Sequence, residues 1–294
     1  MKRLREFAYF EPVTLEDATA ILVAGGSGAR VIAGGTDLVV DMKTGRLRPS
    51  SVVNIKRIEG LAGIEAADGG IRIGALTKAS AIQASTLIGE RVRALADAAS
   101  VLASPPVRAL ATIGGNVGRA SPASDLGPAL IVHQAIATIV GPDGSRDETV
   151  ESLYVGPGTT TLAAHDILVS FFIPDAAPGT GSAHLKIGTR ASGTDIAMVG
   201  VSAAVTVGPA NTINAARIAL ASVAPTPMRA ARAEAMLIGR EAAEESIAAA
   251  GEAAAGECRP ISDLRAGAAH RIALVRVLTM RALRIAIERA GGGA

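Results

Sequence analysis

The sequence predicts an α+β protein in two domains. Up to Pro174, short apolar runs typical of strands alternate with segments of helical periodicity. The segment 175–182 is rich in Pro, Gly and Ser and continues neither periodicity, and further strand-like and helical segments follow it. With 49% hydrophobic and 19% charged residues, the 294-residue chain has the composition of a soluble globular protein with room for two cores.

The part before Pro174 is expected to mix helices with strands. A first helix spans 15–24, with Thr14 as its N-cap and Gly25-Gly26 at its end. The strand 29–33 leads into the turn 34–37, which opens a helix of about two turns. The other expected elements are strands at 51–55, 70–74 and 166–173, helices at 78–85 and 90–99, and strands within the apolar segment 129–140.

The linker 175–182 places the domain boundary near Ala177. Three strands are expected after it, at 183–189, 197–207 and 212–222, and then helices at 228–237, 241–255 and about 267–290. The last helix carries a series of arginines that we expect on a solvent-exposed face. They are Arg271, Arg276, Arg281, Arg284 and Arg289.

Composition excludes several classes of partner. Four Phe, two Tyr and no Trp leave few stacking platforms for nucleic acid, and the net charge of +2 is spread without a basic run. No apolar run approaches the roughly 18 residues of a membrane span, and the basic N-terminus has no apolar stretch behind it, so the expected location is the cytoplasm. The single cysteine, Cys258, allows neither an internal disulfide nor a Cys-ligated metal centre, so any metal is expected in a partner.

Several catalytic motifs are missing. The chain has no Gly-Lys dipeptide of a phosphate loop, no His-Glu-x-x-His zinc motif and no Gly-x-Ser-x-Gly nucleophile turn. Its glycine clusters lack the spacing of a nicotinamide dinucleotide fingerprint. His133, His165, His184 and His270 stand in unrelated contexts. We therefore predict no catalytic side chain and no metal ligand.

Two glycine turns remain, Gly34-Gly35-Thr36-Asp37 and Thr112-Ile113-Gly114-Gly115-Asn116. Successive N–H groups on a glycine turn, with a helix start behind them, form a concave site for phosphate. Each pair alone is more often only a tight turn. Together, with Thr and Asn side chains beside them, the turns indicate an extended cofactor site in which two loops hold one diphosphate.

These segments carry a family resemblance. Residues 33–38, 111–116 and 121–125 resemble the successive FAD-binding signatures of the flavoprotein subunit in molybdenum hydroxylases, the family of xanthine dehydrogenase and carbon monoxide dehydrogenase. The resemblance continues through 166–168, 186–190 and 223–227 to 261–265, which is nearly the whole chain. The sequence departs from the family pattern at Pro106, Gly267 and His270, where the family often has Gln, Ser and Tyr.

The resemblance implies a fold, a cofactor and a site. The fold would be a two-subdomain FAD-binding fold of the PCMH type, like vanillyl-alcohol oxidase, over residues 1–177, with subdomains of about 1–55 and 56–177. A carbon monoxide dehydrogenase flavoprotein C-terminal-like domain with a three-stranded sheet and a helical bundle would occupy 183–290. The residues implied to bind FAD are Val31, Ile32, Ala33, Gly34, Gly35, Thr36, Asp37, Leu38, Leu102, Ala111, Thr112, Gly115, Asn116, Ser124, Asp125, Leu168 and Lys186.

The resemblance also implies roles. The two glycine loops would hold the diphosphate, Ser124 and Asp125 the polyol, and Leu102 and Leu168 would lie beside the adenine and the isoalloxazine. Lys186 would stabilise the negative charge of reduced FAD.

The complex would contain a large molybdopterin-binding subunit and a small subunit with [2Fe–2S] clusters, as a dimer of heterotrimers. This chain would pass electrons from those clusters through FAD to an external acceptor. Two alternatives stay open at this point. One is a stand-alone FAD-binding or maturation protein without redox partners, and the other is a nucleotide-sensing or structural protein in which both glycine loops are only turns.

Overall fold

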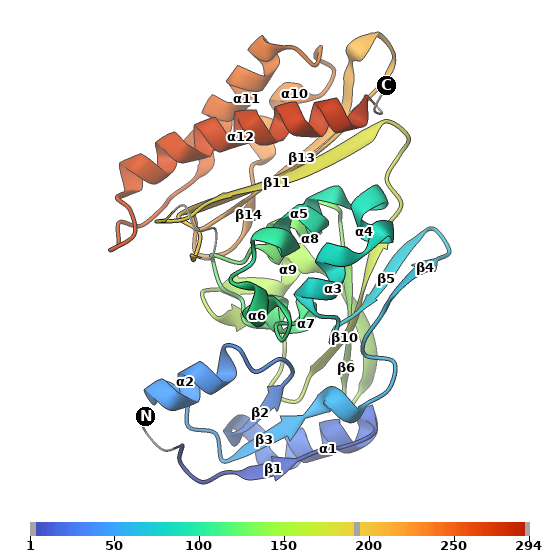
Figure 1. Cartoon of the computed structure of the whole chain (residues 1–294), viewed down its shortest axis with the longest axis vertical. Coiled ribbons are helices and arrows are strands. Elements are labelled where there is room, and N and C mark those ends of the chain that lie inside the picture. Colours follow the sequence, from blue (N-terminus) through green and yellow to red (C-terminus); the bar gives the residue numbers. More distant parts are fainter. Residues whose placement is uncertain (1–3, 191–194, 292–294) are drawn as a thin grey trace.

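The computed structural model describes residues 4–190 and 195–291 and shows three layers stacked along the long axis of the molecule (Figure 1). The N-terminal segment lies at one end, a helix-rich middle layer follows, and the C-terminal sheet and helices form the other end. Residues 1–3 of the basic N-terminus lie outside the described residues. The predicted mixture of helices and strands is confirmed.

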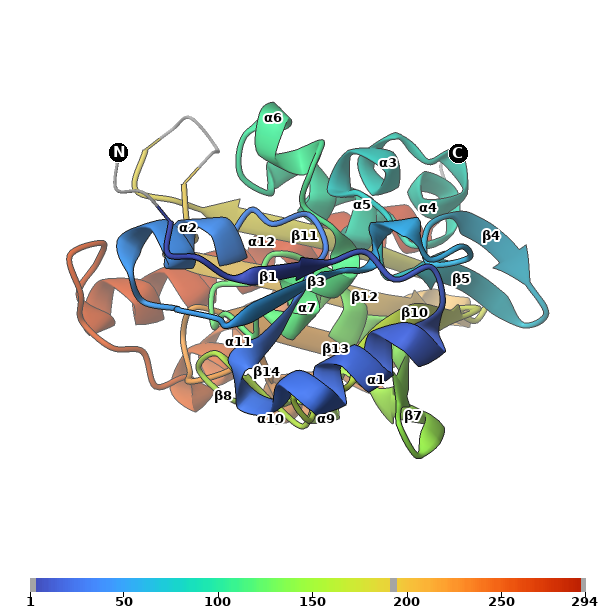
Figure 2. The same ribbon diagram turned by 90° about the horizontal axis from the view of Figure 1, so that it is seen from below.

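The first layer is a parallel sheet in the order β1-β3-β2, formed by Ala8–Phe10, Ser51–Asn54 and Ala29–Ile32. Helix α1 (Leu15–Gly25) runs along this sheet (Figure 2), and Thr14 caps it by accepting a hydrogen bond from the Asp17 N–H, as predicted. The 3-10 turns η1 (Gly26–Gly28) and η2 (Ile55–Arg57) flank the strands, and α2 (Leu38–Thr44) follows the first glycine turn.

The middle layer contains an antiparallel sheet in the order β4-β5-β10-β6-β7. Its strands are Ile64–Ala67, Gly70–Gly74, Ile167–Pro174, Ile136–Gly141 and Gly144–Thr149. One apolar core is surrounded by the helices of this layer, which are α3 (Ala79–Ala84), α4 (Thr86–Arg91), α5 (Arg93–Val101), α6 (Pro105–Arg108), α7 (Ile113–Gly118), α8 (Leu126–Val132) and α9 (Val150–Leu153). The hairpin β8-β9 (Tyr154–Gly156, Thr159–Thr160) follows α9.

Two expectations for this layer were wrong in part. The segment 129–140 is not all strand, because α8 occupies Leu126–Val132 and only Ile136–Gly141 is β6. All seven residues of α8 are buried, so the sequence shows no amphipathic period there. The helix expected at 90–99 is interrupted at Val92, whose φ of −138° is not helical and separates α4 from α5.

The C-terminal layer is a sheet of four strands, not three, in the order β11-β12-β13-β14. The long strands are Thr180–Ile187, Val199–Val207 and Ile213–Ala221, with the turn η3 (Pro209–Asn211) between the last two. The fourth strand, Met228–Arg229, takes the start of the helix expected at 228–237, so α10 begins at Ala231 and ends at Leu237. Helices α11 (Glu244–Glu257) and α12 (Ala268–Ala290) complete this layer.

The linker is shorter than predicted, because Thr180, Gly181 and Ser182 belong to β11. A Cβ on Gly181 would lie 2.1 Å from the carbonyl oxygen of Ala286, so this glycine allows β11 to pack directly on α12. The opposite face of the sheet contacts α5 and α8 of the middle layer. The C-terminal sheet is thus covered on both faces, and β11 lies beside α5, a helix that precedes the second glycine loop.

The arginine series of α12 is not a uniform solvated face. Arg271 is 2% exposed and donates to the carbonyl oxygens of Met198 and Ser222 and to Asp263. Arg289 forms an ion pair with Asp97 of α5. Only Arg276, Arg281 and Arg284 are exposed as predicted.

Candidate functional site

A cleft of about 690 Å³ opens between the first and the middle layer and extends to β11, a size typical of cofactor sites. All but one of the residues implied to bind FAD line it, although they come from segments as far apart as the end of β2 and β11. Ile32 does not line the cleft; its Cδ1 lies 3.1 Å from where a Cβ on Gly35 would be.

The first glycine loop presents free backbone donors. Gly35 has a φ of +73°, a conformation that favours glycine, and turns the chain between β2 and α2. Within the described residues, the N–H groups of 34–38 donate no hydrogen bond to the protein. A Cβ on Gly34 would lie 2.1 Å from the Leu110 carbonyl oxygen, so this loop lies directly against the backbone before the second glycine loop. The loop is therefore a concave row of N–H groups that can bind an anion by donating hydrogen bonds to it.

The second glycine loop is different, and the expectation that it also offers free N–H groups was wrong. The N–H groups of Ile113 and Gly114 donate to the carbonyl oxygens of Thr77 and Ala75, at 3.0 and 2.8 Å. Those of Gly115 and Asn116 donate to Oγ1 and the carbonyl oxygen of Thr112, at 3.1 and 3.0 Å. Thr112 is thus the N-cap of α7. This loop contributes side chains to the cleft, and its backbone donors are used internally.

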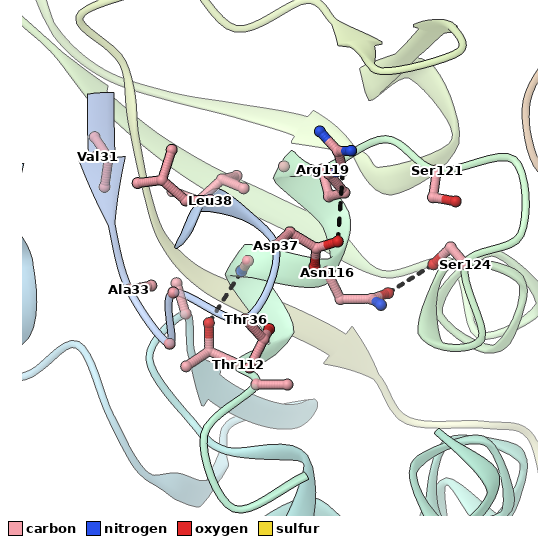
Figure 3. A pocket seen from close by; sticks show the side chains of 18 of the residues that line it. Val31, Ala33, Thr36, Asp37, Leu38, Thr112, Asn116, Arg119, Ser121 and Ser124 are labelled. Carbon is pink, nitrogen blue, oxygen red and sulfur yellow. Dashed lines mark hydrogen bonds and ion pairs between the residues drawn. The ribbon is translucent and has the colours of Figure 1, made fainter. Parts of the chain in front are cut away.

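Asn116 is held in place by Ser124 (Figure 3). The Ser124 hydroxyl donates to Oδ1 of Asn116 at 2.6 Å and accepts the Gly127 N–H at 2.9 Å. Because Oδ1 is occupied, the amide nitrogen of Asn116 is the group left to donate to a ligand, and it has no partner in the part of the chain that the structure describes. Ser124 therefore orients a donor at the wall of the cleft.

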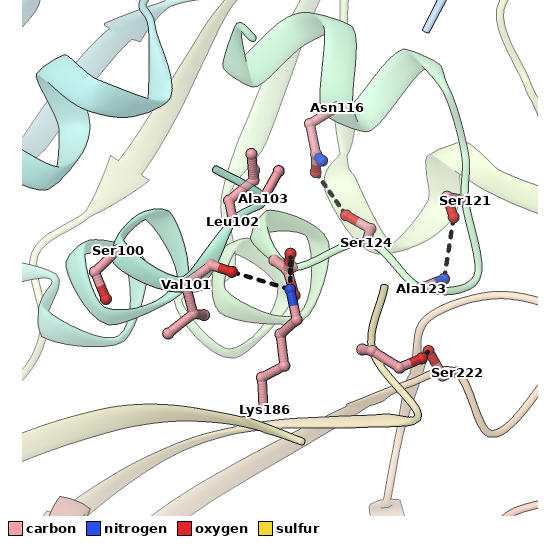
Figure 4. A network of polar contacts seen from close by, with 12 residues as sticks. Ser100, Val101, Leu102, Ala103, Asn116, Ser121, Ala123, Ser124, Lys186 and Ser222 are labelled. Atoms are coloured by element: carbon pink, nitrogen blue, oxygen red, sulfur yellow. Dashed lines mark hydrogen bonds and ion pairs between the residues drawn. The ribbon is translucent and has the colours of Figure 1, made fainter. Parts of the chain in front are cut away.

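Asp125 and Lys186 form a buried ion pair at the other end of the cleft (Figure 4). Nζ of Lys186 lies 2.9 Å from Oδ2 of Asp125 and also 2.9 Å from the carbonyl oxygen of Val101, at the end of α5. Burial raises the pKa of Asp125 to about 6, against the opposing effect of Lys186. Oδ1 of Asp125 is buried and has no hydrogen-bond partner among the described residues. A buried carboxylate oxygen of this kind requires a donor, which a ligand can supply.

Comparison with known proteins identifies the family of the chain and its cofactor. Residues 5–176 match the model of the FAD binding domain in molybdopterin dehydrogenase, and residues 183–286 match that of the CO dehydrogenase flavoprotein C-terminal domain. The chain belongs to the FAD-binding subunits of the molybdenum hydroxylases. It is therefore an oxidoreductase subunit whose cofactor is FAD, and the resemblance seen in the sequence is confirmed.

Relatives of this FAD-binding subunit align with it over almost its whole length. The carbon monoxide dehydrogenase medium chain of Hydrogenophaga pseudoflava is 34% identical over 96% of this chain and 98% of its own. The xanthine dehydrogenase FAD-binding subunit of Escherichia coli O157:H7 is 31% identical over 97% of both chains. The solved carbon monoxide dehydrogenase of Hydrogenophaga pseudoflava that lacks the Mo-pyranopterin moiety superposes with a TM-score of 0.94, at 33% identity, over 98% of this chain and 99% of that one.

The residues present in the cleft fit FAD. The free N–H groups of 34–38 suit the diphosphate, and the unpartnered Oδ1 of Asp125 suits a hydroxyl donor such as the cofactor's polyol chain. The largely buried side chains of Leu102 and Leu168 offer apolar surface for flat rings in a chain poor in aromatic residues. Among the described residues no His, Cys, Asp and Glu side chains cluster as a metal site, and no helix is both long and apolar enough to cross a membrane.

The sequence did not indicate some of the residues that line the cleft. Arg119, Asp41, Asp195 and Ile196 also line it. Arg119 stands three residues after the second glycine loop, which was a usable signal for a positive charge near the cleft. No such signal exists in the sequence for Asp41 and Ile196, because only the packing of α2 and of the segment after β11 brings them to the cleft.

Proposed function

We propose that this chain is the electron-transfer subunit of a heteromeric molybdenum hydroxylase. It would receive electrons from [2Fe–2S] clusters of a small partner subunit and deliver them from FAD to an external acceptor. The observation that carries this proposal is the cleft itself, where a row of free N–H groups, an oriented amide donor and an unpartnered carboxylate oxygen converge. Bound FAD supplies the entry and exit of electrons, and the protein positions and tunes its ring.

The FAD-binding residues implied by the resemblance are retained as a proposal. Gly34, Gly35 and Thr36 would bind the diphosphate through backbone N–H groups, which nothing else in the described chain occupies. Asn116 would add its amide donor, and Asp125 would accept from the polyol. Thr112, Gly115 and Ser124 are then positioning residues, since their polar groups bond to other protein groups of the site.

Two apolar side chains and one cation complete the proposed contacts. Leu102 and Leu168, 6% and 8% exposed, would flank the adenine and the isoalloxazine. Lys186 would place a positive charge near the ring and favour the reduced flavin, which carries negative charge. The side chain of Lys186 is 4% exposed, so water would screen this charge little.

The proposed partners are a large molybdopterin-binding subunit and a small [2Fe–2S] subunit, assembled as a dimer of heterotrimers. The relatives named medium chain or FAD-binding subunit support this division of labour. The one cysteine of this chain, Cys258, is 1% exposed and donates to the Ala255 carbonyl oxygen, so it does not present a cluster ligand at the surface. The cytoplasmic location remains a prediction from the sequence.

The domain division 1–177 and 183–290, with subdomains of about 1–55 and 56–177, is also proposed. Three hydrophobic clusters support it. One lies mainly under the first sheet, one in the middle layer, and one between the C-terminal sheet and α10–α12.

The decisive experiment is native purification from the source organism with cofactor analysis. The absorption spectrum and released cofactors should show stoichiometric FAD, and a molybdenum subunit and an iron–sulfur subunit should copurify. FAD in a chain that purifies alone would favour the stand-alone or maturation alternative. No flavin, even after incubation of the purified chain with FAD, would overturn the proposal and leave both glycine loops as turns.

A further inference from the structure

Arg119 joins the two walls of the cleft. It follows α7 directly, and its side chain ion-pairs with carboxylates of the first layer (Figure 3). Nη1 lies 2.8 Å from Oδ2 of Asp41, and Nε lies 3.6 Å from Oδ1 of Asp37. Asp41 is on α2 and its side chain is 9% exposed, whereas that of Asp37 is 60% exposed. Arg119 is thereby held next to the glycine loop whose N–H groups are free.

Arg119 is the cation of its ion-paired group that faces the cleft. Asp41 has a second cationic partner, because its Oδ1 lies 3.3 Å from Nε of Arg46. The side chains of Arg46 and Asp37 are 66% and 60% exposed, so water screens both charges, and Asp41 and Arg119 are the less exposed members of the group. Arg46 does not line the cleft, whereas Arg119 does. Arg119 is consequently the positive charge of this group that a ligand in the cleft can reach.

The other cations that line the described cleft are engaged elsewhere. Arg30 donates to the carbonyl oxygens of Ser27 and Ala29, within its own loop. Lys186 is bound to Asp125 and to the end of α5. Arg119 is therefore the cleft-lining cation that stands beside residues 34–38. Its side chain is 41% exposed, so it can contact a ligand without breaking its ion pair with Asp41.

We propose that Arg119 is a further FAD-binding residue, and that its guanidinium, held by Asp41 and Asp37, is the countercharge for the cofactor's diphosphate. A guanidinium has five N–H donors, so ion pairs with two carboxylates leave donors for phosphate oxygens. Without it, the diphosphate would stand beside two carboxylates of the same sign of charge. This inference rests on the proposed FAD site.

The test measures which part of the flavin depends on Arg119. The full chain, freed of flavin, is titrated with FAD and with riboflavin, which lacks the diphosphate, and binding is followed by flavin fluorescence. Loss of one charge-assisted contact predicts that Arg119→Gln raises the Kd for FAD by about tenfold and changes the Kd for riboflavin by less than about twofold. Arg119→Lys retains the charge and should recover most of the FAD affinity. The salt dependence of FAD binding should also weaken in Arg119→Gln.

Arg46→Gln is the matched control, since Arg46 contacts the same Asp41 but lies outside the cleft. It should leave the Kd for FAD within about threefold of the wild-type value, because screening weakens an exposed charge at this range. Three results would each overturn the inference: equal weakening of FAD and riboflavin, equal effects of the two Gln variants, or unchanged FAD affinity in Arg119→Gln. If the wild-type chain bound neither flavin, the proposed function would fail together with this inference. If the wild-type chain bound FAD and any of the three results above were found, only the inference about Arg119 would fail.

Discussion

Nζ of Lys186 lies 2.9 Å from Oδ2 of Asp125, and the two side chains are 4% and 10% exposed. Lys186 is on β11 of the C-terminal sheet, and Asp125 precedes α8 in the middle layer. The cleft is therefore completed by a strand from beyond the linker. A buried ion pair gains little net stability, but removal of one partner leaves a buried charge without compensation.

Lys186→Met should destabilise the folded chain. The substitution removes the cation and leaves Asp125 buried, so we expect a loss of about 3–5 kcal/mol in the free energy of unfolding. Urea denaturation of the flavin-free chain, followed by circular dichroism, measures this loss. The double variant Lys186→Met/Asp125→Leu should recover most of the stability, because no buried charge remains.

The same double variant separates stability from cofactor binding. Since Asp125 is the proposed acceptor for the cofactor's polyol, the double variant should still bind FAD at least about tenfold more weakly than the wild-type chain. Wild-type FAD affinity in a stable double variant would show that Asp125 serves only the fold.

The pH dependence of stability follows from Asp125. Burial raises its pKa to about 6 in the folded chain, above its unfolded value. The stability from such a group is fully present below the unfolded pKa and is lost as the pH rises through the folded one. Between about pH 4 and pH 7 the wild-type chain should therefore lose about 2 kcal/mol relative to Asp125→Asn, which does not titrate. Parallel pH profiles of the two flavin-free chains in urea denaturation would contradict this assignment.

Gly35→Val should abolish FAD retention. Gly35 has a φ of +73°, so a branched side chain would strain the turn, and its Cβ would crowd Ile32 and Val39. Both effects would displace the N–H groups of 34–38. Gly60→Val is the matched control, because Gly60 has a φ of +77°, lies outside the cleft and has nothing within 4 Å of a built Cβ. Both variants should lose about 1–2 kcal/mol of stability, but only Gly35→Val should lose flavin in gel filtration. Full flavin occupancy in Gly35→Val would remove this loop from the site.

Arg271→Leu should destabilise the C-terminal domain without changing FAD binding. Arg271 donates to two carbonyl oxygens at 2.6 and 3.1 Å and to Asp263 at 2.8 Å, and it does not line the cleft. The loss of these buried bonds should cost about 3 kcal/mol in urea denaturation. The exposed pair of Arg276 with Glu252 provides the comparison, since Arg276→Leu should cost less than about 1 kcal/mol. Equal losses would mean that burial of Arg271 contributes nothing.

The sequence by itself determined the elements whose signals are local. Thr14 caps α1, the alternation before Pro174 is β10, and the last helix spans Ala268–Ala290 within one residue of its predicted start. These features depend on capping, periodicity and turn chemistry between residues close in the chain. The family signatures likewise located the segments that meet in the cleft, because each is a short contiguous motif.

Only the tertiary structure decided how those segments work. It converted Leu126–Val132 into a fully buried helix, where no polar face remains to show a period. It directed the N–H groups of Ile113 and Gly114 to acceptors far back along the chain and left those of 34–38 without a partner among the residues that the structure describes. It also paired Lys186 with Asp125, 61 residues apart. Such pairings depend on which surfaces pack together, and a local sequence pattern does not indicate the distant residue with which it pairs.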